Sequence, residues 1–267
     1  MSEQAQTQHT ETGEGDRIGF DRFGAEGAPG VVFIAGAGPF RAMDPTTTET
    51  ARLAAEQGAQ TLVYDRLGRG DSQAEGELTL ERELAAIAAA IDAVGGSAAL
   101  VGHSSGCSIA LAAADAGLPV TALALWEAPI GQFEGGAAQF EADFLRHLDA
   151  GDHEAAQKEY MRDMPPEFLE GAMQDPAWPQ IVLGSRSYRA DARSLAWAEE
   201  LPAEERYARI TMPVLVMVGR ETFPGMRETA DVLVAAIPGA RFRTMPGAMH
   251  EWEPGRMAAA IAELARG

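Results

Sequence analysis

Short apolar runs alternate with amphipathic segments along most of the chain. The apolar runs, which predict buried strands, lie at residues 17–23, 31–34, 61–64, 98–101, 120–126, 214–218 and 241–245. Between them, apolar residues at helical spacing predict helices at about 44–58, 80–94, 108–114, 226–237 and 255–265. Buried strands that alternate with helices indicate an α/β protein, with a mostly parallel, doubly wound sheet and helices on both of its faces.

The alternation is interrupted between residues 131 and 208. This segment has no clear strand pattern, but it has apolar residues at helical spacing and turn signals at its prolines. It predicts a helical insertion into a core made of residues 17–130 and 209–267. Residues 1–16 are mostly polar, so we expect a disordered N-terminal tail there.

The amino-acid composition argues against several kinds of binding partner. The formal net charge is −19, from 40 acidic and 21 basic residues, which argues against nucleic acid and anionic membranes as partners. Cys107 is the only cysteine, so the sequence predicts neither an intrachain disulfide nor a cysteine-based metal site. No apolar stretch is long enough to span a bilayer, and the first residues lack the apolar segment of a signal peptide. We therefore expect a cytoplasmic protein.

The most specific motif is Gly-His-Ser-Ser-Gly at residues 102–106, a G-x-S-x-G pattern. It lies where the strand at 98–101 passes into the helix at 108–114. Ser104 at its centre must therefore occupy a very sharp turn, and Gly102 and Gly106 leave the room that such a turn requires. The serine hydroxyl then projects above the carboxyl ends of the strands, which is typical of a catalytic nucleophile.

A serine hydroxyl needs a base that accepts its proton, and histidine is the usual one because its pKa is near neutral. His250 follows the last predicted strand, in a loop from which it can reach Ser104. The other histidines fit less well, because one lies in the tail, one at the variable position of the motif and two in the insertion (His9, His103, His147 and His153). We predict that His250 is the base.

The base in turn needs a carboxylate that orients it and stabilises its charged form. Two glutamates follow strands in the required chain order, Glu127 after 120–126 and Glu221 after 214–218. Glu127 emerges from an apolar strand and is expected to be buried, so it needs a partner such as a histidine. We favour Glu127 as the acid. The alternatives are Glu221 as the acid, and a structural ion pair between Glu127 and a cation such as Arg66.

Backbone N–H groups at a helix start are suited to stabilise the oxyanion that forms when a serine attacks a carbonyl group. The Ser105 N–H lies at the start of the helix after Ser104. We expect the second donor in the loop at residues 35–39, which follows a strand, and we predict the Ala37 N–H. Gly36 in this loop lets the backbone approach a ligand closely.

These segments together resemble the α/β-hydrolase superfamily over about residues 17–265. The matching segments are the loop at 35–38, the sequence Tyr-Asp-Arg-Leu-Gly-Arg-Gly-Asp-Ser at 64–72, the serine motif at 102–106 and the histidine loop at 246–250. Two positions depart from the family pattern. Ala35 stands where many members have histidine, and the usual aspartate after the strand at 214–218 is missing. An acid at Glu127 is similar to the arrangement in zearalenone-lactonase-like hydrolases.

The resemblance implies an α/β-hydrolase fold in which residues 131–208 form a helical lid, inserted after the sixth strand of the family's sheet. It also implies a serine hydrolase that cleaves an apolar carboxylic ester or lactone through an acyl-enzyme on Ser104, with no cofactor and no metal. The residues expected to line the substrate site are Gly36, Trp126, Met161, Met164, Trp178, Tyr188 and Trp197. Alternatives are carbon–carbon hydrolysis, thioester cleavage or a lyase reaction on the same triad, or a ligand-binding receptor with slow turnover. Apolar residues of the lid equally allow a homodimer.

Overall fold

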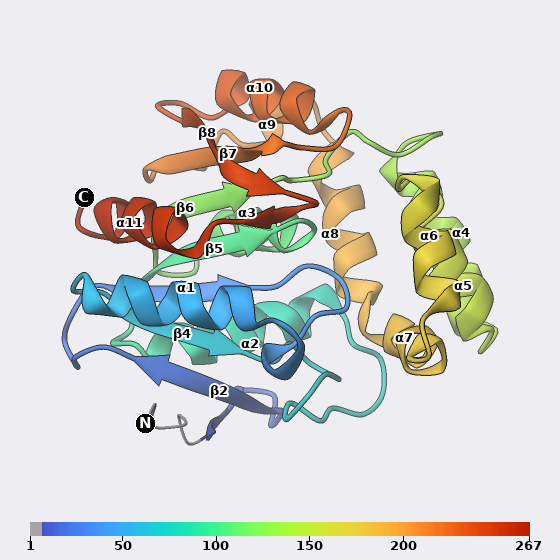
Figure 1. The fold of residues 1–267 in the computed structure, drawn as a ribbon, viewed down its shortest axis with the longest axis horizontal. Coiled ribbons are helices and arrows are strands. Elements are labelled where there is room, and N and C mark those ends of the chain that lie inside the picture. The colour runs from blue at the N-terminus through green and yellow to red at the C-terminus, as the bar shows by residue number, and fades with distance from the viewer. Residues whose placement is uncertain (1–6) are drawn as a thin grey trace.

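A nine-stranded sheet forms the centre of the protein in the computed structural model, which describes residues 7–267 (Figure 1). The strands are β1 (Gln8–Glu11), β2 (Arg17–Phe23), β3 (Gly30–Ile34), β4 (Gln60–Tyr64), β5 (Ala98–His103), β6 (Val120–Trp126), β7 (Val214–Glu221), β8 (Arg241–Ala248) and β9 (Glu251–Trp252). Their order across the sheet is β1-β2-β4-β3-β5-β6-β7-β8-β9. Neighbours from β4 to β8 run parallel, whereas β1, β2 and β9 are antiparallel to their neighbours. The predicted mostly parallel sheet is confirmed.

Helices cover both faces of this sheet, as the sequence predicts. α1 (Pro45–Glu56) and α11 (Pro254–Ala265) pack together on one face, and α2 (Leu80–Asp92), α3 (Gly106–Asp115) and α10 (Met226–Ala236) lie on the other (Figure 1). A short 3₁₀ helix, η1 (Arg41–Met43), precedes α1. The predicted start of α1 is confirmed, because the Asp44 side chain accepts a hydrogen bond from the Thr47 N–H and Pro45 is the first helical residue.

Between β6 and β7, the described chain contains helices and no strand, as the pattern of residues 131–208 predicts. The helices are α4 (Ala137–Asp149), α5 (His153–Tyr160), α6 (Pro166–Gln174), α7 (Trp178–Gly184), η2 (Ser185–Ser187), α8 (Arg189–Glu199) and α9 (Ala203–Arg206). α8 packs against α3 at the carboxyl ends of the strands, and α4 to α7 lie beyond it (Figure 1). The insertion therefore stands over the edge where parallel α/β sheets bind ligands.

The expected disorder of residues 1–16 is wrong for β1, while residues 1–6 lie outside the described part of the chain. β1 pairs with β2 in register from Gln8 opposite Phe20 to Glu11 opposite Arg17. Its polar side chains gave no strand signal, but an exposed edge strand is held by backbone hydrogen bonds and needs no apolar face. Among residues 7–267, no helix combines the length and the apolar character that crossing a membrane requires.

Candidate active site

Ser104 lies in a strained turn between β5 and α3, as its motif predicts. Its φ is +55°, a left-handed value that is unfavourable for a residue with a side chain. The flanking glycines are needed because nothing larger fits. A Cβ on Gly102 would lie 2.6 Å from the Cα of Cys107, and one on Gly106 would lie 2.3 Å from the carbonyl oxygen of Ile34. The turn presents Ser104 to a cavity at the carboxyl edge of the sheet.

His250 and Glu127 form a short hydrogen bond. The His250 Nδ1–H donates to Glu127 Oε2 over 2.5 Å, and the Gly219 N–H donates to Glu127 Oε1 over 2.9 Å. Glu127 is 1% exposed, and burial alone would raise the pKa of its carboxyl group, but these hydrogen bonds outweigh burial and hold the pKa below its usual value. Glu127 is therefore a carboxylate. It leaves Nε2 of His250 as the ring nitrogen that can accept a proton.

The structure places Glu127, and not Glu221, against the imidazole. Glu221 is exposed at the end of β7. The Glu127 carboxylate extends from the end of β6 to the backbone of β7, where a Cβ on Gly219 would lie 3.1 Å from Oε1. Because Gly219 has no side chain, the Glu127 carboxylate has space beside it. The alternative ion pair of Glu127 with Arg66 is wrong, because Arg66 pairs with Asp191.

Left-handed backbone conformations gather at this site. Among residues 7–267, the non-glycine residues with positive φ are Ser104, Glu127, Met249 and His250, at +55°, +48°, +53° and +70°. Such conformations cost about 1–3 kcal/mol each and concentrate at functional sites, where the surrounding structure enforces them. The residues predicted as nucleophile, acid and base therefore share a rare backbone feature.

His103, at the variable position of the serine motif, holds the loop that carries His250. Its Nε2–H donates to the His250 carbonyl oxygen over 2.9 Å, and Trp126 Nε1–H donates to the same oxygen over 3.0 Å. Burial and the neighbouring His250 lower the pKa of His103 to about 4, so its ring is neutral at physiological pH. The proton on its Nε2 is committed to this backbone contact.

The residues predicted to bind an oxyanion lie around the Ser104 turn. A Cβ on Gly36 would lie 2.9 Å from the Cβ of Ser104, so this loop passes very close to the serine. Ala37 lines the same cavity as Ser104, and Ser105 is the N-cap residue of α3. Within residues 7–267, no hydrogen bond joins the Ser104 hydroxyl to His250. Catalytic hydrogen bonds are often longer in ligand-free enzymes and shorten when substrate binds.

Ser104 and His250 face a mostly apolar cavity of about 710 Å³. Its wall combines the loops at the carboxyl edge of the sheet with side chains from the helical insertion. The larger apolar members are Phe133, Tyr160, Met164, Phe168, Leu195, Phe223, Met226 and Met249. A cavity of this size and character is typical of a small-molecule site.

Only part of the predicted substrate-binding set lines this cavity. Gly36 and Met164 do. The structure places the others outside the lining: Trp126, Met161, Trp178, Tyr188 and Trp197. Tyr188 is buried in the apolar core, and Trp197 lies beneath the guanidinium of Arg206, 4.5 Å from it. Helical spacing identifies the apolar face of a helix, but it does not show whether that face packs on other helices or lines a cavity. The assignment of these five residues to the substrate site is therefore wrong.

Cys107 has no nucleophilic role here. Its side chain is buried, its thiol donates to the Gly102 carbonyl oxygen, and burial raises its pKa, so it stays protonated. In the described residues, no group of three or more His, Cys, Asp or Glu side chains is arranged to hold a metal ion.

A parallel sheet of this order, with a strained serine turn and a histidine loop at its carboxyl edge, defines an α/β hydrolase. A family model described as the alpha/beta hydrolase family matches residues 31–264. The chain belongs to this family of hydrolases, and the resemblance drawn from its motifs is confirmed.

Three solved structures give the scale of the similarity. An alpha/beta hydrolase from Sphaerobacter thermophilus has a TM-score of 0.79 and 31% identity, over 96% of this chain and 99% of that one. A thermophilic esterase from Thermogutta terrifontis has a TM-score of 0.68 and 22% identity, over 98% of each chain. An esterase from Exiguobacterium antarcticum has a TM-score of 0.67 and 18% identity, over 98% of this chain and 100% of that one. The two esterases support the fold alone. A search of curated protein sequences gives no match.

Proposed function

We propose that the protein hydrolyses an apolar carboxylic ester or lactone. Ser104 is the nucleophile, His250 is the general base and then the general acid, and Glu127 orients His250. One observation carries this proposal: three left-handed residues meet at the carboxyl edge of the sheet, with His250 bonded to Glu127 and sharing a cavity with Ser104. Nucleophilic acyl transfer requires this combination of groups.

In the first half-reaction, Ser104 Oγ attacks the carbonyl carbon while His250 Nε2 accepts the hydroxyl proton. Negative charge develops on the former carbonyl oxygen, where the N–H groups of Ala37 and Ser105 bind it. The tetrahedral intermediate then collapses, and His250 gives its proton to the leaving alcohol oxygen. Water repeats these steps on the acyl-enzyme and releases the carboxylic acid. Glu127 stabilises the charged imidazole in both halves.

The cavity supports an uncharged substrate with an apolar acyl chain or ring. Aromatic and methionine side chains make up most of its larger lining residues, and its acidic members are Asp163 and Glu251. The protein also carries a formal net charge of −19, so an anionic substrate would be repelled both locally and at long range. Neutral esters should therefore be turned over faster than matched esters that carry a carboxylate.

A panel of p-nitrophenyl esters with graded acyl length, together with simple lactones, tests the substrate class. We expect turnover above about one per second for the best substrate, as is typical of enzymes. Turnover of carbon–carbon or thioester substrates alone would move the protein to another reaction on the same residues.

Covalent labelling tests the mechanism. A fluorophosphonate should label Ser104 alone, because only an activated hydroxyl attacks phosphorus quickly. Ser104→Ala should abolish the labelling and leave the melting temperature unchanged. Labelling at another residue, or none in a folded protein, would refute the proposal.

A further inference from the structure

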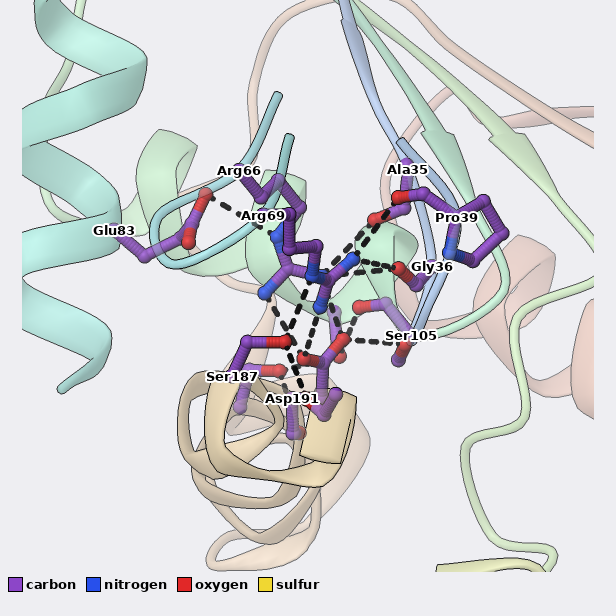
Figure 2. Close-up of polar contacts among 12 residues, drawn as sticks. Ala35, Gly36, Pro39, Arg66, Arg69, Glu83, Ser105, Ser187 and Asp191 are labelled. Carbon is purple, nitrogen blue, oxygen red and sulfur yellow. Dashed lines mark hydrogen bonds and ion pairs between the residues drawn. The ribbon is translucent and has the colours of Figure 1, made fainter. Parts of the chain in front are cut away.

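A buried cluster of charged side chains joins the loop at residues 35–39 to the helical insertion (Figure 2). Arg66 and Arg69 follow β4, and Asp191 lies in the first turn of α8; their side chains are at most 3% exposed. Arg66 donates to the two Asp191 oxygens over 2.7 and 3.0 Å, and Arg69 donates to Oδ2 over 3.2 Å. Glu83 lies 3.2 Å from Nε of Arg66, so two cations face two anions.

Such a cluster is not needed to fill space. Taking charges out of water is unfavourable, and well-packed apolar residues of similar volume often stabilise a fold equally well or better. These charges instead contact the backbone at one specific place, the loop that passes beside Ser104. That contact indicates that the cluster positions the backbone of this loop.

Both guanidinium groups bind the carbonyl oxygen of Gly36 (Figure 2). Arg69 Nη1 donates to it over 2.6 Å and Arg66 Nη1 over 3.3 Å. The Gly36 carbonyl and the Ala37 N–H belong to one planar trans peptide, so they point in opposite directions. Holding the carbonyl against the cluster therefore turns the Ala37 N–H away from it. A cation at the carbonyl end also polarises the amide and strengthens its N–H as a donor.

Asp191 reaches the second predicted donor as well. The Ser105 hydroxyl donates to Asp191 Oδ1 over 2.7 Å, in the buried region between α3 and α8 (Figure 2). Asp191 is therefore hydrogen-bonded directly to Ser105. It is linked to the Gly36–Ala37 peptide through the guanidinium groups of Arg66 and Arg69. A single carboxylate of the insertion thus holds both residues whose N–H groups would bind an oxyanion.

We propose that Arg66, Arg69 and Asp191 are positioning residues for the oxyanion hole. They hold the N–H groups of Ala37 and Ser105 where negative charge develops in the transition state, and they do so without touching the substrate. This role rests on the proposed ester or lactone hydrolysis and deepens it, because it gives the helical insertion a part in stabilising the transition state.

Arg69→Lys is the most informative variant. It keeps the positive charge that faces Asp191, but an ammonium group lacks the planar fork that bonds Gly36, Ser187 and Asp191 together. We expect kcat on the best ester to fall about 100-fold, with KM changed less than about threefold. The affinity for a boronic acid with the same acyl group should fall by a similar factor, because its adduct with Ser104 is tetrahedral like the transition state.

Tyr64→Phe is the matched control. The Tyr64 hydroxyl donates to Glu83 over 2.9 Å. Glu83 lies on the side of the cluster away from the loop (Figure 2). This variant should lower the melting temperature while leaving kcat and boronate affinity within about twofold of the wild type. Asp191→Asn is a second test variant and should weaken both readouts. If Asp191→Asn does not fold, Arg69→Lys decides alone.

Three results would overturn the proposal. If Arg69→Lys and Asp191→Asn lose thermal stability but keep kcat and boronate affinity, the cluster only supports the fold. If Tyr64→Phe loses as much kcat as the other variants, the effect does not pass through the loop. A wild-type protein that neither turns over esters nor binds the boronate would overturn the proposed hydrolysis itself, and the positioning role with it.

Discussion

Replacing Glu127 by glutamine removes one charge with almost no change in volume, and it should lower kcat about a thousandfold or more. The glutamine oxygen can still accept the hydrogen bond from the Gly219 N–H. Its NH₂ group then faces the His250 Nδ1–H, so two hydrogen-bond donors point at each other. In the wild type, the Glu127 carboxylate accepts a hydrogen bond from this N–H. His250 restores a hydrogen bond by moving its proton to Nε2, and Nε2 can then no longer accept the proton of Ser104.

The geometry of the pair gives the size of the loss. Nδ1 of His250 and Oε2 of Glu127 are 2.5 Å apart. The charge centres of the protonated imidazole and the carboxylate are then about 4 Å apart, where unit charges attract by about 4 kcal/mol at an effective dielectric constant of about 20. About 1.4 kcal/mol corresponds to a factor of ten in rate, so losing this attraction in the transition state slows the reaction about 1,000-fold. The wrong tautomer adds to that loss.

Steady-state kinetics on the best ester, for the wild type, Glu127→Gln and Glu221→Gln, measures the effect. Glu221 is exposed at the end of β7, so its amide variant should lose less than about tenfold. If Glu221→Gln is the slower variant, or if folded Glu127→Gln keeps most of its activity, the reasoning is refuted.

Melting curves are needed beside the kinetics. The lowered pKa of Glu127 contributes stability above its usual value of 4.5, and this stability is lost as the pH falls through the folded pKa. Glu127→Gln removes that contribution, so a fraction of its lost activity at neutral pH could come from unfolded protein. Measuring kcat well below the melting temperature separates the two effects.

His250→Ala should cost about as much in kcat as loss of the nucleophile, because the three residues act as a unit. His103→Ala loses a hydrogen bond to the His250 carbonyl and ring contacts with His250 and Trp252, and it should cost about tenfold. Equal losses in the two variants would show that the base is misplaced. Gly219→Ala should lower kcat about tenfold, because its Cβ would lie 3.1 Å from Oε1 of Glu127. Gly171→Ala adds its Cβ in open space and should have no effect. The unfolded chain binds a proton at His103 below pH 6.5, whereas the folded chain does so only below about pH 4. The free energy of unfolding should therefore fall by up to about 3 kcal/mol between pH 7 and pH 4. Urea unfolding should show this loss in the wild type and in His9→Gln but reduced in His103→Gln; three identical pH profiles would contradict it.

Much of the fold can be predicted because its elements carry local signals. Buried parallel strands are continuous apolar runs, and α1 begins with a capping aspartate and a proline. The serine turn is equally local, since both glycines and the serine lie within residues 102–106. Glu127 could be favoured over Glu221 for a related reason: a glutamate at the end of an apolar strand is buried and needs a partner.

The lining of the cavity could not be predicted, because it depends on how the helices of the insertion pack. Tyr188 and Trp197 belong to apolar faces that meet other helices. α6, in contrast, has no buried residue although its sequence contains Phe168, which lines the cavity. An apolar residue that its own helix leaves unburied is available to a ligand, but only the packed structure reveals it. The Arg66–Asp191 contact spans 125 residues and is invisible to local patterns for the same reason.

Trp126 explains how the strained backbone of the proposed triad is maintained. The residue is fully buried, its carbonyl oxygen accepts from the Ser104 N–H over 2.9 Å, and its indole N–H donates to the His250 carbonyl oxygen over 3.0 Å. Glu127 is the next residue in the chain. Left-handed residues persist only where their surroundings enforce them. Here the Trp126 indole constrains His250, the Trp126 carbonyl group constrains Ser104, and the peptide bond after Trp126 constrains Glu127. A residue predicted to bind substrate therefore holds in place the residues that would act on it.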